Sequence, residues 1–205
     1  AKSFDTRDVE LAADVRARDK AIDQLEILIN DEAAKLLALR SPTAIDLRLV
    51  LSVIKVASNL ERIGDYSKNM AKRTTVLMEM PHVFDKGQGL RRLAREVELM
   101  LKDALDAYVQ RDVNLAEEVI QRDRDVDQMY SGQFREFLTY MMEDPRNITP
   151  CMHLHFIAKN IERMGDHVTS IAEQVIYIVT GDRPTEEREK KDKTSADSNI
   201  SLDLE

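Results

Sequence analysis

The sequence has little of what a disulfide-stabilised or β-rich protein needs. Its 205 residues include one cysteine, no tryptophan, five phenylalanines and five tyrosines. A single cysteine excludes an intramolecular disulfide. Six glycines and five prolines are too few for the many turns of a β-sandwich or barrel. These shortages favour an all-α fold of long helices, in one large domain or two small ones.

Positive charge and long apolar runs are also scarce. Lys and Arg number 30 against 38 Asp and Glu, so the net charge is 30 − 38 = −8. Because proteins that bind nucleic acid neutralise phosphates with Lys and Arg, this balance argues against direct nucleic-acid binding. No apolar run approaches the ~20 residues of a membrane span, and the N-terminus does not read as a signal peptide. We therefore expect a cytoplasmic protein.

An internal duplication is the strongest pattern in the chain. Residues 7–24 match residues 111–128 at an offset of 111 − 7 = 104, with ten identities in eighteen positions. A second match pairs ASNLERIGD at 57–65 with AKNIERMGD at 158–166, at an offset of 158 − 57 = 101. The chain therefore contains two copies of one unit, and the second copy is three residues shorter between the matched segments.

Each copy has the apolar spacing of a helical hairpin. In the first copy we expect helices from about residue 6 to 39 and from about 43 to 78, with Thr43 as the N-cap of the second. In the second copy, we expect Asp112 to cap a helix that ends near residue 143. Thr149 followed by Pro150 predicts the start of a last helix, and Gly181 predicts its end.

The second copy has one helix more than the first. Residues 89–110 carry apolar side chains at helical spacing, namely Leu90, Leu93, Val97, Leu101, Leu105 and Tyr108. If the copies are equivalent, the matching helix of the first copy falls mostly before residue 1. We therefore expect tandem, pseudo-symmetric three-helix bundles with the first helix missing. The expected division is a first bundle at 1–80, a linker at 81–88, a second bundle at 89–181 and a disordered tail at 182–205.

Pairs of carboxylates four residues apart recur at equivalent positions of the two copies. Two acids at this spacing share a helix face and repel each other unless a cation lies between them. Hard cations such as Mg²⁺, Mn²⁺ or iron prefer oxygen ligands. Two such pairs on adjacent helices would bring four carboxylates together, so the pattern predicts one metal site in each copy. The alternative is that these acids are solvated faces inherited from one ancestral copy. The pairs are Asp19 with Asp23, Glu61 with Asp65, Asp123 with Asp127, and Glu162 with Asp166.

Glycine and arginine accompany the acids in both copies. Gly64 and Gly165 lie inside helices, where glycine costs about 1 kcal/mol relative to alanine, so each indicates a close approach. The approaching group is either another helix or a bound ion. Arg62 and Arg163 either pair with acids of another helix or receive an anion such as phosphate.

Two other kinds of site are weaker alternatives. Cys151 and His155 share a helix face, but no second cluster completes a zinc shell, and His167 suits packing better than metal ligation. A ferritin-type di-metal enzyme needs a histidine three residues after the glutamate, and neither Glu61 nor Glu162 has one. A purely structural helical protein without a bound ion also remains open.

The motifs resemble those of the PhoU family of bacterial phosphate-uptake regulators. The similarity rests on four segments and covers about residues 6 to 181. The segments are PTAIDLRLV at 42–50, ERIGD at 61–65, TYMMED at 139–144 and IERMGD at 161–166.

The resemblance implies a non-enzymatic role in phosphate homeostasis. Family members are negative regulators of the phosphate-starvation response, and link a phosphate ABC transporter to a sensor histidine kinase. They are usually homodimers. Their acidic motifs bind metal ions or multinuclear clusters, which by position are the four acidic pairs named above. The resemblance predicts that this chain meets the membrane only through its partners, and leaves the metal's identity open.

Overall fold

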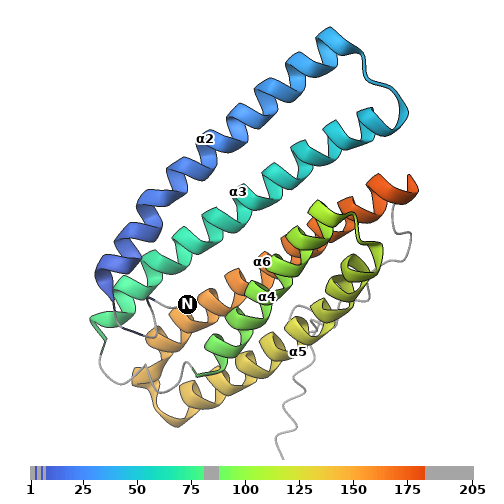
Figure 1. Cartoon of the computed structure of the whole chain (residues 1–205). Coiled ribbons are helices and arrows are strands. Elements are labelled where there is room, and N and C mark those ends of the chain that lie inside the picture. Colours follow the sequence, from blue (N-terminus) through green and yellow to red (C-terminus); the bar gives the residue numbers. More distant parts are fainter. Residues whose placement is uncertain (1–2, 4–5, 7, 81–87, 183–205) are drawn as a thin grey trace, which may run out of the picture.

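The computed structural model describes residues 3, 6, 8–80 and 88–182, and Figure 1 shows their arrangement. The expected linker and tail lie outside the described residues except for Gln88 and Asp182. Within the described part of the chain every regular element is helical, which confirms the all-α prediction. The elements are α2 (Val9–Arg40), α3 (Ala44–Met78), α4 (Gln88–Gln110), α5 (Val113–Glu143), the short 3₁₀ helix η2 (Pro145–Asn147) and α6 (Ile148–Thr180).

The two copies begin their first matched helix in the same way. The Asp8 carboxylate accepts a hydrogen bond of 2.8 Å from the backbone N–H of Leu11 at the start of α2. Asp112 accepts one of 3.1 Å from the N–H of Leu115 at the start of α5. Each cap satisfies a backbone donor that the first helical turn leaves free. The prediction for Asp112 is confirmed.

The second helix of each hairpin begins differently from the prediction. Thr43 occupies the N-cap of α3, but its side chain makes no capping hydrogen bond. The prediction that Thr149 caps α6 is wrong, because α6 begins at Ile148 with Asn147 as its N-cap. The 3₁₀ turn directly before it is capped instead by Asp144, which accepts from the N–H of Arg146 at 2.9 Å.

Three helices form a complete bundle and two form a hairpin beside it. Helices α4, α5 and α6 all contact one another, α2 packs on α3, and α3 packs on α6 (Figure 1). The continuous hydrophobic core therefore runs from the second copy into α3. α4 buries a stripe with heptad spacing, which departs from the predicted stripe after Val97. Its fully buried members are Leu90, Leu93, Val97, Met100, Ala104 and Ala107.

The C-terminus of α6 ends on a glycine that the chain geometry requires. Gly181 is in the left-handed conformation with φ 87°, and its N–H donates to the carbonyl of Tyr177 at 3.0 Å. A Cβ at this position would lie 2.2 Å from Nη1 of Arg48, which is in α3. The Arg48 side chain of α3 therefore lies directly against the C-terminal cap of α6.

Replacing this glycine gives a first prediction. Gly181→Ala should lower the free energy of unfolding by about 1–2 kcal/mol, because the left-handed conformation is strained for alanine. Chemical denaturation followed by circular dichroism measures the change. Gly132→Ala is the matched control, since nothing lies within 4 Å of a Cβ there, and it should stabilise the helix slightly.

None of the described helices is both long enough and apolar enough to cross a bilayer.

Candidate functional site

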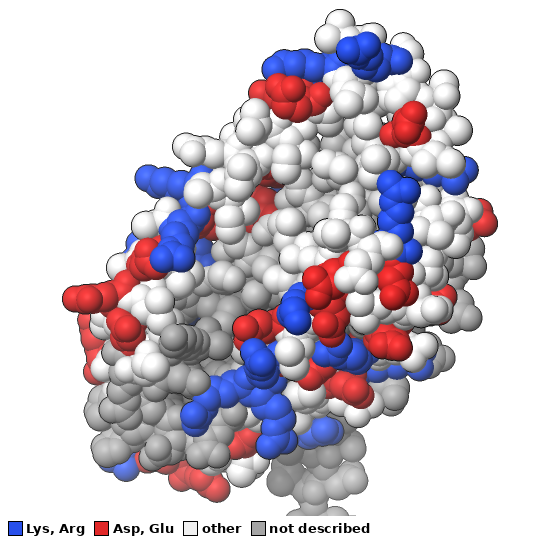
Figure 2. Space-filling model, in the orientation of Figure 1, with Lys and Arg blue, Asp and Glu red and all other residues white. Residues whose placement is uncertain are grey.

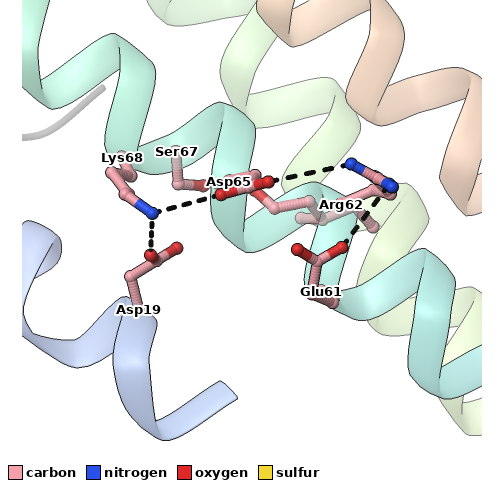
Figure 3. Close-up of polar contacts among 7 residues, drawn as sticks. Asp19, Glu61, Arg62, Asp65, Ser67 and Lys68 are labelled. Carbon is pink, nitrogen blue, oxygen red and sulfur yellow. Dashed lines mark hydrogen bonds and ion pairs between the residues drawn. The ribbon is translucent and has the colours of Figure 1, made fainter. Parts of the chain in front are cut away.

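The first acidic cluster forms where α2 crosses α3. Asp19 of α2 is buried, with 2% of its side chain exposed, and its carboxylate is paired with the ammonium group of Lys68 in α3. The same ammonium donates to Oδ1 of Asp65 at 3.2 Å (Figure 3). Lys68 therefore bridges two of the predicted metal ligands, and these two hydrogen bonds raise its pKa.

Glu61 and Arg62 extend this cluster along α3. Arg62 Nε lies 3.5 Å from Glu61 Oε2, and Arg62 Nη1 lies 3.9 Å from Asp65 Oδ2 (Figure 3). The arginine thus pairs with acids of its own helix rather than of another helix. The pKa of Glu61 is raised, first by burial and then by the charges of Asp65 and Glu26, and Arg62 opposes the rise.

The second acidic cluster has its own lysine. Glu162 of α6 is buried, and Lys159 Nζ lies 3.0 Å from its Oε2. Burial raises the pKa of Glu162, the lysine opposes the shift, and the negative charges of Asp166 and Asp127 add to it. The predicted ligands Asp127 and Glu162, from α5 and α6, therefore lie close enough to interact.

The glycines mark where each hairpin packs most tightly. A Cβ on Gly165 would lie 3.2 Å from Oδ1 of Asp123 and 3.4 Å from Cγ1 of Val126, both in α5. A Cβ on Gly64 would lie 3.2 Å from Ile22 Cδ1 and 3.6 Å from Asp19 Oδ1, both in α2. The group that approaches each glycine is thus a neighbouring helix. It brings the buried aspartate of each copy against the helix that carries the Glu-Arg-x-Gly-Asp motif.

The structure brings the predicted ligands together only in part. Among the described residues no group of three or more His, Cys, Asp or Glu side chains is arranged to hold a metal ion. Among the described residues no hydrogen bond or ion pair joins Asp23 to the rest of the first cluster, although its side chain is only partly exposed. The observation that fits a cation is Asp19 Oδ1, a buried oxygen without a hydrogen-bond partner. An all-oxygen donor set suits a hard cation, which would take the position that lysine holds.

The two lysines were not predicted from the sequence as members of the acidic clusters. Lys68 follows Asp65 by three residues and Lys159 precedes Glu162 by three, so each shares a helix face with its acid. That spacing is visible in the sequence. The duplication concealed it, because the offset of 101 pairs Lys68 with Thr169 and Lys159 with Ser58. The lysine that balances the acidic charge therefore occupies a different position in each copy.

His155, His167 and Cys151 lie in packing contacts between helices or within the core. His167 Nδ1 donates to Asn59 Oδ1 at 2.7 Å, and the ring lies 5.6 Å from that of Tyr66 across the contact between α6 and α3. Cys151 is buried, and His155 contacts the rings of Tyr130, Phe134 and Phe156.

A pH-dependent effect is expected at Glu162. Its folded-state pKa lies above the ordinary value, so protonation favours the folded state, and this contribution is lost as pH rises through the folded pKa. Glu162→Gln should therefore raise the melting temperature at pH 7 but leave it nearly unchanged at a pH below the ordinary glutamate value. Thermal unfolding across pH measures this. Equal effects at both pH values would contradict it, and exposed Glu98→Gln is the control.

Comparison with known proteins identifies the family. The PhoU domain model matches residues 1–74 and 90–175, two segments that coincide with the two sequence copies. The chain belongs to the PhoU family. It is 46% identical over 188 residues to the phosphate-specific transport system accessory protein PhoU homolog of Rhizobium meliloti, covering 92% of this chain and 79% of that protein. The Caulobacter vibrioides homolog is 44% identical over 92% of this chain and 82% of its own length.

Solved structures agree with this membership. The crystal structure of PhoU from Pseudomonas aeruginosa superimposes with a TM-score of 0.83 at 40% identity, covering 88% of this chain and 86% of that one. The phosphate transport system regulatory protein PhoU from Streptococcus pneumoniae gives 0.81 at 28% identity, covering 89% and 85%. These relatives are named as accessory or regulatory proteins. Those names describe accessory and regulatory proteins rather than enzymes, in agreement with the predicted non-enzymatic role.

Proposed function

We propose that this protein is an accessory regulator of a phosphate-specific transport system. The observation that carries the proposal is the PhoU domain match over both copies, together with relatives named for phosphate-specific transport. The protein acts in the cytoplasm and reaches the membrane only through its partners.

The regulatory step we propose is negative. When phosphate is plentiful, the protein holds the ATPase of the phosphate ABC transporter and a sensor histidine kinase in an inhibitory arrangement, as a homodimer. This follows from the resemblance to PhoU regulators.

We further propose that the acidic clusters bind a divalent or iron-type cation. The residues that would hold it are Asp19, Asp23, Glu61 and Asp65 in the first copy and Asp123, Asp127, Glu162 and Asp166 in the second. The cation would neutralise carboxylates that are now paired with lysine. Support comes from the unpartnered Asp19 oxygen and from the pKa values of Glu61 and Glu162, which burial raises above the ordinary value.

A binding experiment tests both proposals. Purified protein and the double variant Asp65→Ala/Asp166→Ala are compared for metal content by elemental analysis and for binding to the kinase and the transporter ATPase. We expect the variant to lose bound metal and to bind its partners at least several-fold more weakly. The control is Glu32→Ala/Glu98→Ala, which removes two exposed acids outside the clusters.

The outcomes separate the proposals. Absence of metal from the wild-type protein with partner binding intact would remove the cation and leave a structural helical adaptor. Absence of binding to either partner, by protein that is folded, would overturn the regulatory function.

A further inference from the structure

Two helix segments carry no acidic residue, although the protein is acidic overall. Asp and Glu make up 38 of the 205 residues, yet none occurs at 66–78 in α3 or at 145–161 in η2 and α6. Over the surface shown in Figure 2, by comparison, acidic side chains lie among the basic ones. The two segments do contain lysine and arginine, namely Lys68, Lys72, Arg73, Arg146 and Lys159. They are therefore positively charged parts of a negatively charged protein.

These two segments lie side by side. Helices α3 and α6 pack against each other, and they run antiparallel, since Arg48 lies against Gly181 and Arg73 lies against Phe156. The antiparallel direction brings the last turns of α3 beside the first turns of α6. The region without Asp or Glu is thus one continuous part of the surface formed by both helices.

Apolar side chains are exposed in this region. Ile148, Met152 and Phe156 follow one another at intervals of four residues along α6, so they share a helix face. Their exposed fractions are 47%, 40% and 42%. On α3, Val76 is 39% exposed, and the antiparallel direction places it beside the turn of α6 that holds Met152. We define the α3–α6 patch as these apolar residues together with the two nearest cations of α3: Val76, Ile148, Met152, Phe156, Lys72 and Arg73.

The third helix of the bundle does not cover this patch. Gly165 marks the side of α6 that packs against α5 and α4, because a Cβ there would lie 3.2 Å from Asp123 and 3.8 Å from Val97. Phe156 precedes Gly165 by about two and a half helical turns, so it lies on the other side of α6. The α6 part of the patch is therefore exposed in a copy that has all three of its helices.

Arg73 is the charged centre of the α3–α6 patch. Its Cζ lies 4.1 Å from the centre of the Phe156 ring, and its Nη1 lies 3.5 Å from Nδ1 of His153. Among the described residues no carboxylate pairs with it. A guanidinium stacked on a ring keeps its N–H donors at the edge of its plane, so Arg73 is held in place and can still pair with a carboxylate. Arginine and aromatic side chains dominate the binding energy of many protein interfaces.

We propose that the α3–α6 patch is the docking surface for an acidic, amphipathic segment of a partner protein. Apolar side chains of the segment pack on Met152 and Phe156, and its carboxylates pair with Arg73 and Lys72. Charge complementarity selects an acidic occupant, because the two helix segments contain cations but no Asp or Glu. The partner is the transporter ATPase or the kinase of the proposed function, on which this surface therefore depends.

The first test measures binding of the 205-residue chain to the purified ATPase and to the purified kinase by biolayer interferometry. Arg73→Glu and Met152→Asp should each weaken binding to the docked protein about tenfold or more, because each places a negative charge against an acidic segment. Arg92→Glu changes an exposed arginine of α4 outside the patch, and should leave binding unchanged. Wild-type binding that survives both patch variants would overturn the docking surface alone. Absence of wild-type binding to both proteins would overturn the proposed function as well.

A charge exchange tests the acidic segment itself. With p-benzoylphenylalanine in place of Met152, photochemical cross-linking and mass spectrometry identify the segment of the partner that lies on the patch. We expect a segment with Asp or Glu beside apolar residues, and replacing those acids by lysine should restore binding to the Arg73→Glu variant. That rescue would also show that the variant is folded.

Three other results would overturn the proposal. The first is a cross-linked segment without acidic residues. The second is co-sedimentation of the wild-type chain with phosphatidylglycerol vesicles that Arg73→Glu abolishes, since the patch would then bind a lipid surface. The third is a dimer of the chain that Met152→Asp dissociates in sedimentation experiments, since a second copy would then occupy the patch.

Discussion

Gly165→Leu should destabilise the protein by about 2–3 kcal/mol, even though leucine is the better helix former. A Cβ there already lies within 3.2 Å of Asp123 and 3.4 Å of Val126, and leucine adds three more carbon atoms. The added atoms must displace either α5 or Val97 of α4. Urea denaturation of the purified variant measures the loss.

Gly64→Leu is the matched variant in the first copy. Its nearest neighbour would be the flexible end of Ile22 at 3.2 Å, and Gly64 lines an apolar groove of about 430 Å³ between α2 and α3. We expect a destabilisation of less than about 1 kcal/mol, because the larger side chain extends into the groove and gains helix propensity. Equal losses for the two variants would show that the groove is closed in solution.

Much of the fold could be predicted because the duplication repeats each sequence pattern in a second part of the chain. Ten identities between residues 7–24 and 111–128 located the paired helices, and the structure confirms helices over both segments. Asp112 and Gly181 were identified because capping needs a short acceptor before a helix and a left-handed residue after it. These are local requirements, so the sequence expresses them directly.

The errors arose where two local signals compete or where partners come from another helix. Pro145 starts a 3₁₀ turn, and α6 begins directly after that turn at Ile148, two residues before the start at Pro150 that a Thr149 cap predicts. In α4 the predicted stripe followed the large side chains Leu101 and Tyr108, whereas the buried positions are small residues such as Ala104. Small residues carry a weak hydrophobic signal, although they allow the closest helix packing.

The acidic clusters show the same limit. Sequence spacing places Asp19 and Asp65 on faces that can meet, and the structure does bring them together, but through Lys68. A buried carboxylate needs a counter-charge, and sequence alone cannot tell a lysine from a metal ion in that role. The convergence of all four acids in each copy stays a prediction.

Phe137→Ala should have the largest effect of any variant considered, a loss of about 3–5 kcal/mol. Phe137 of α5 is fully buried in the hydrophobic core, and truncation both removes apolar contact and leaves a cavity. Thermal and urea unfolding measure the loss, and Leu138→Ala, 40% exposed on the same helix, should change stability by less than about 1 kcal/mol.

The residue at this position differs between the two copies. Both α2 and α5 are unbroken, so the offset of 104 pairs Phe137 with Ala33. In the second copy a phenylalanine fills the space near the turn of the hairpin. In the first copy Ala33 lines an apolar pocket of about 600 Å³ between α2 and α3. If Phe137→Ala leaves α2 and α3 folded while α4 to α6 lose protection in hydrogen exchange, the copies unfold separately. Because the core runs from α6 into α3, we expect both to lose protection together.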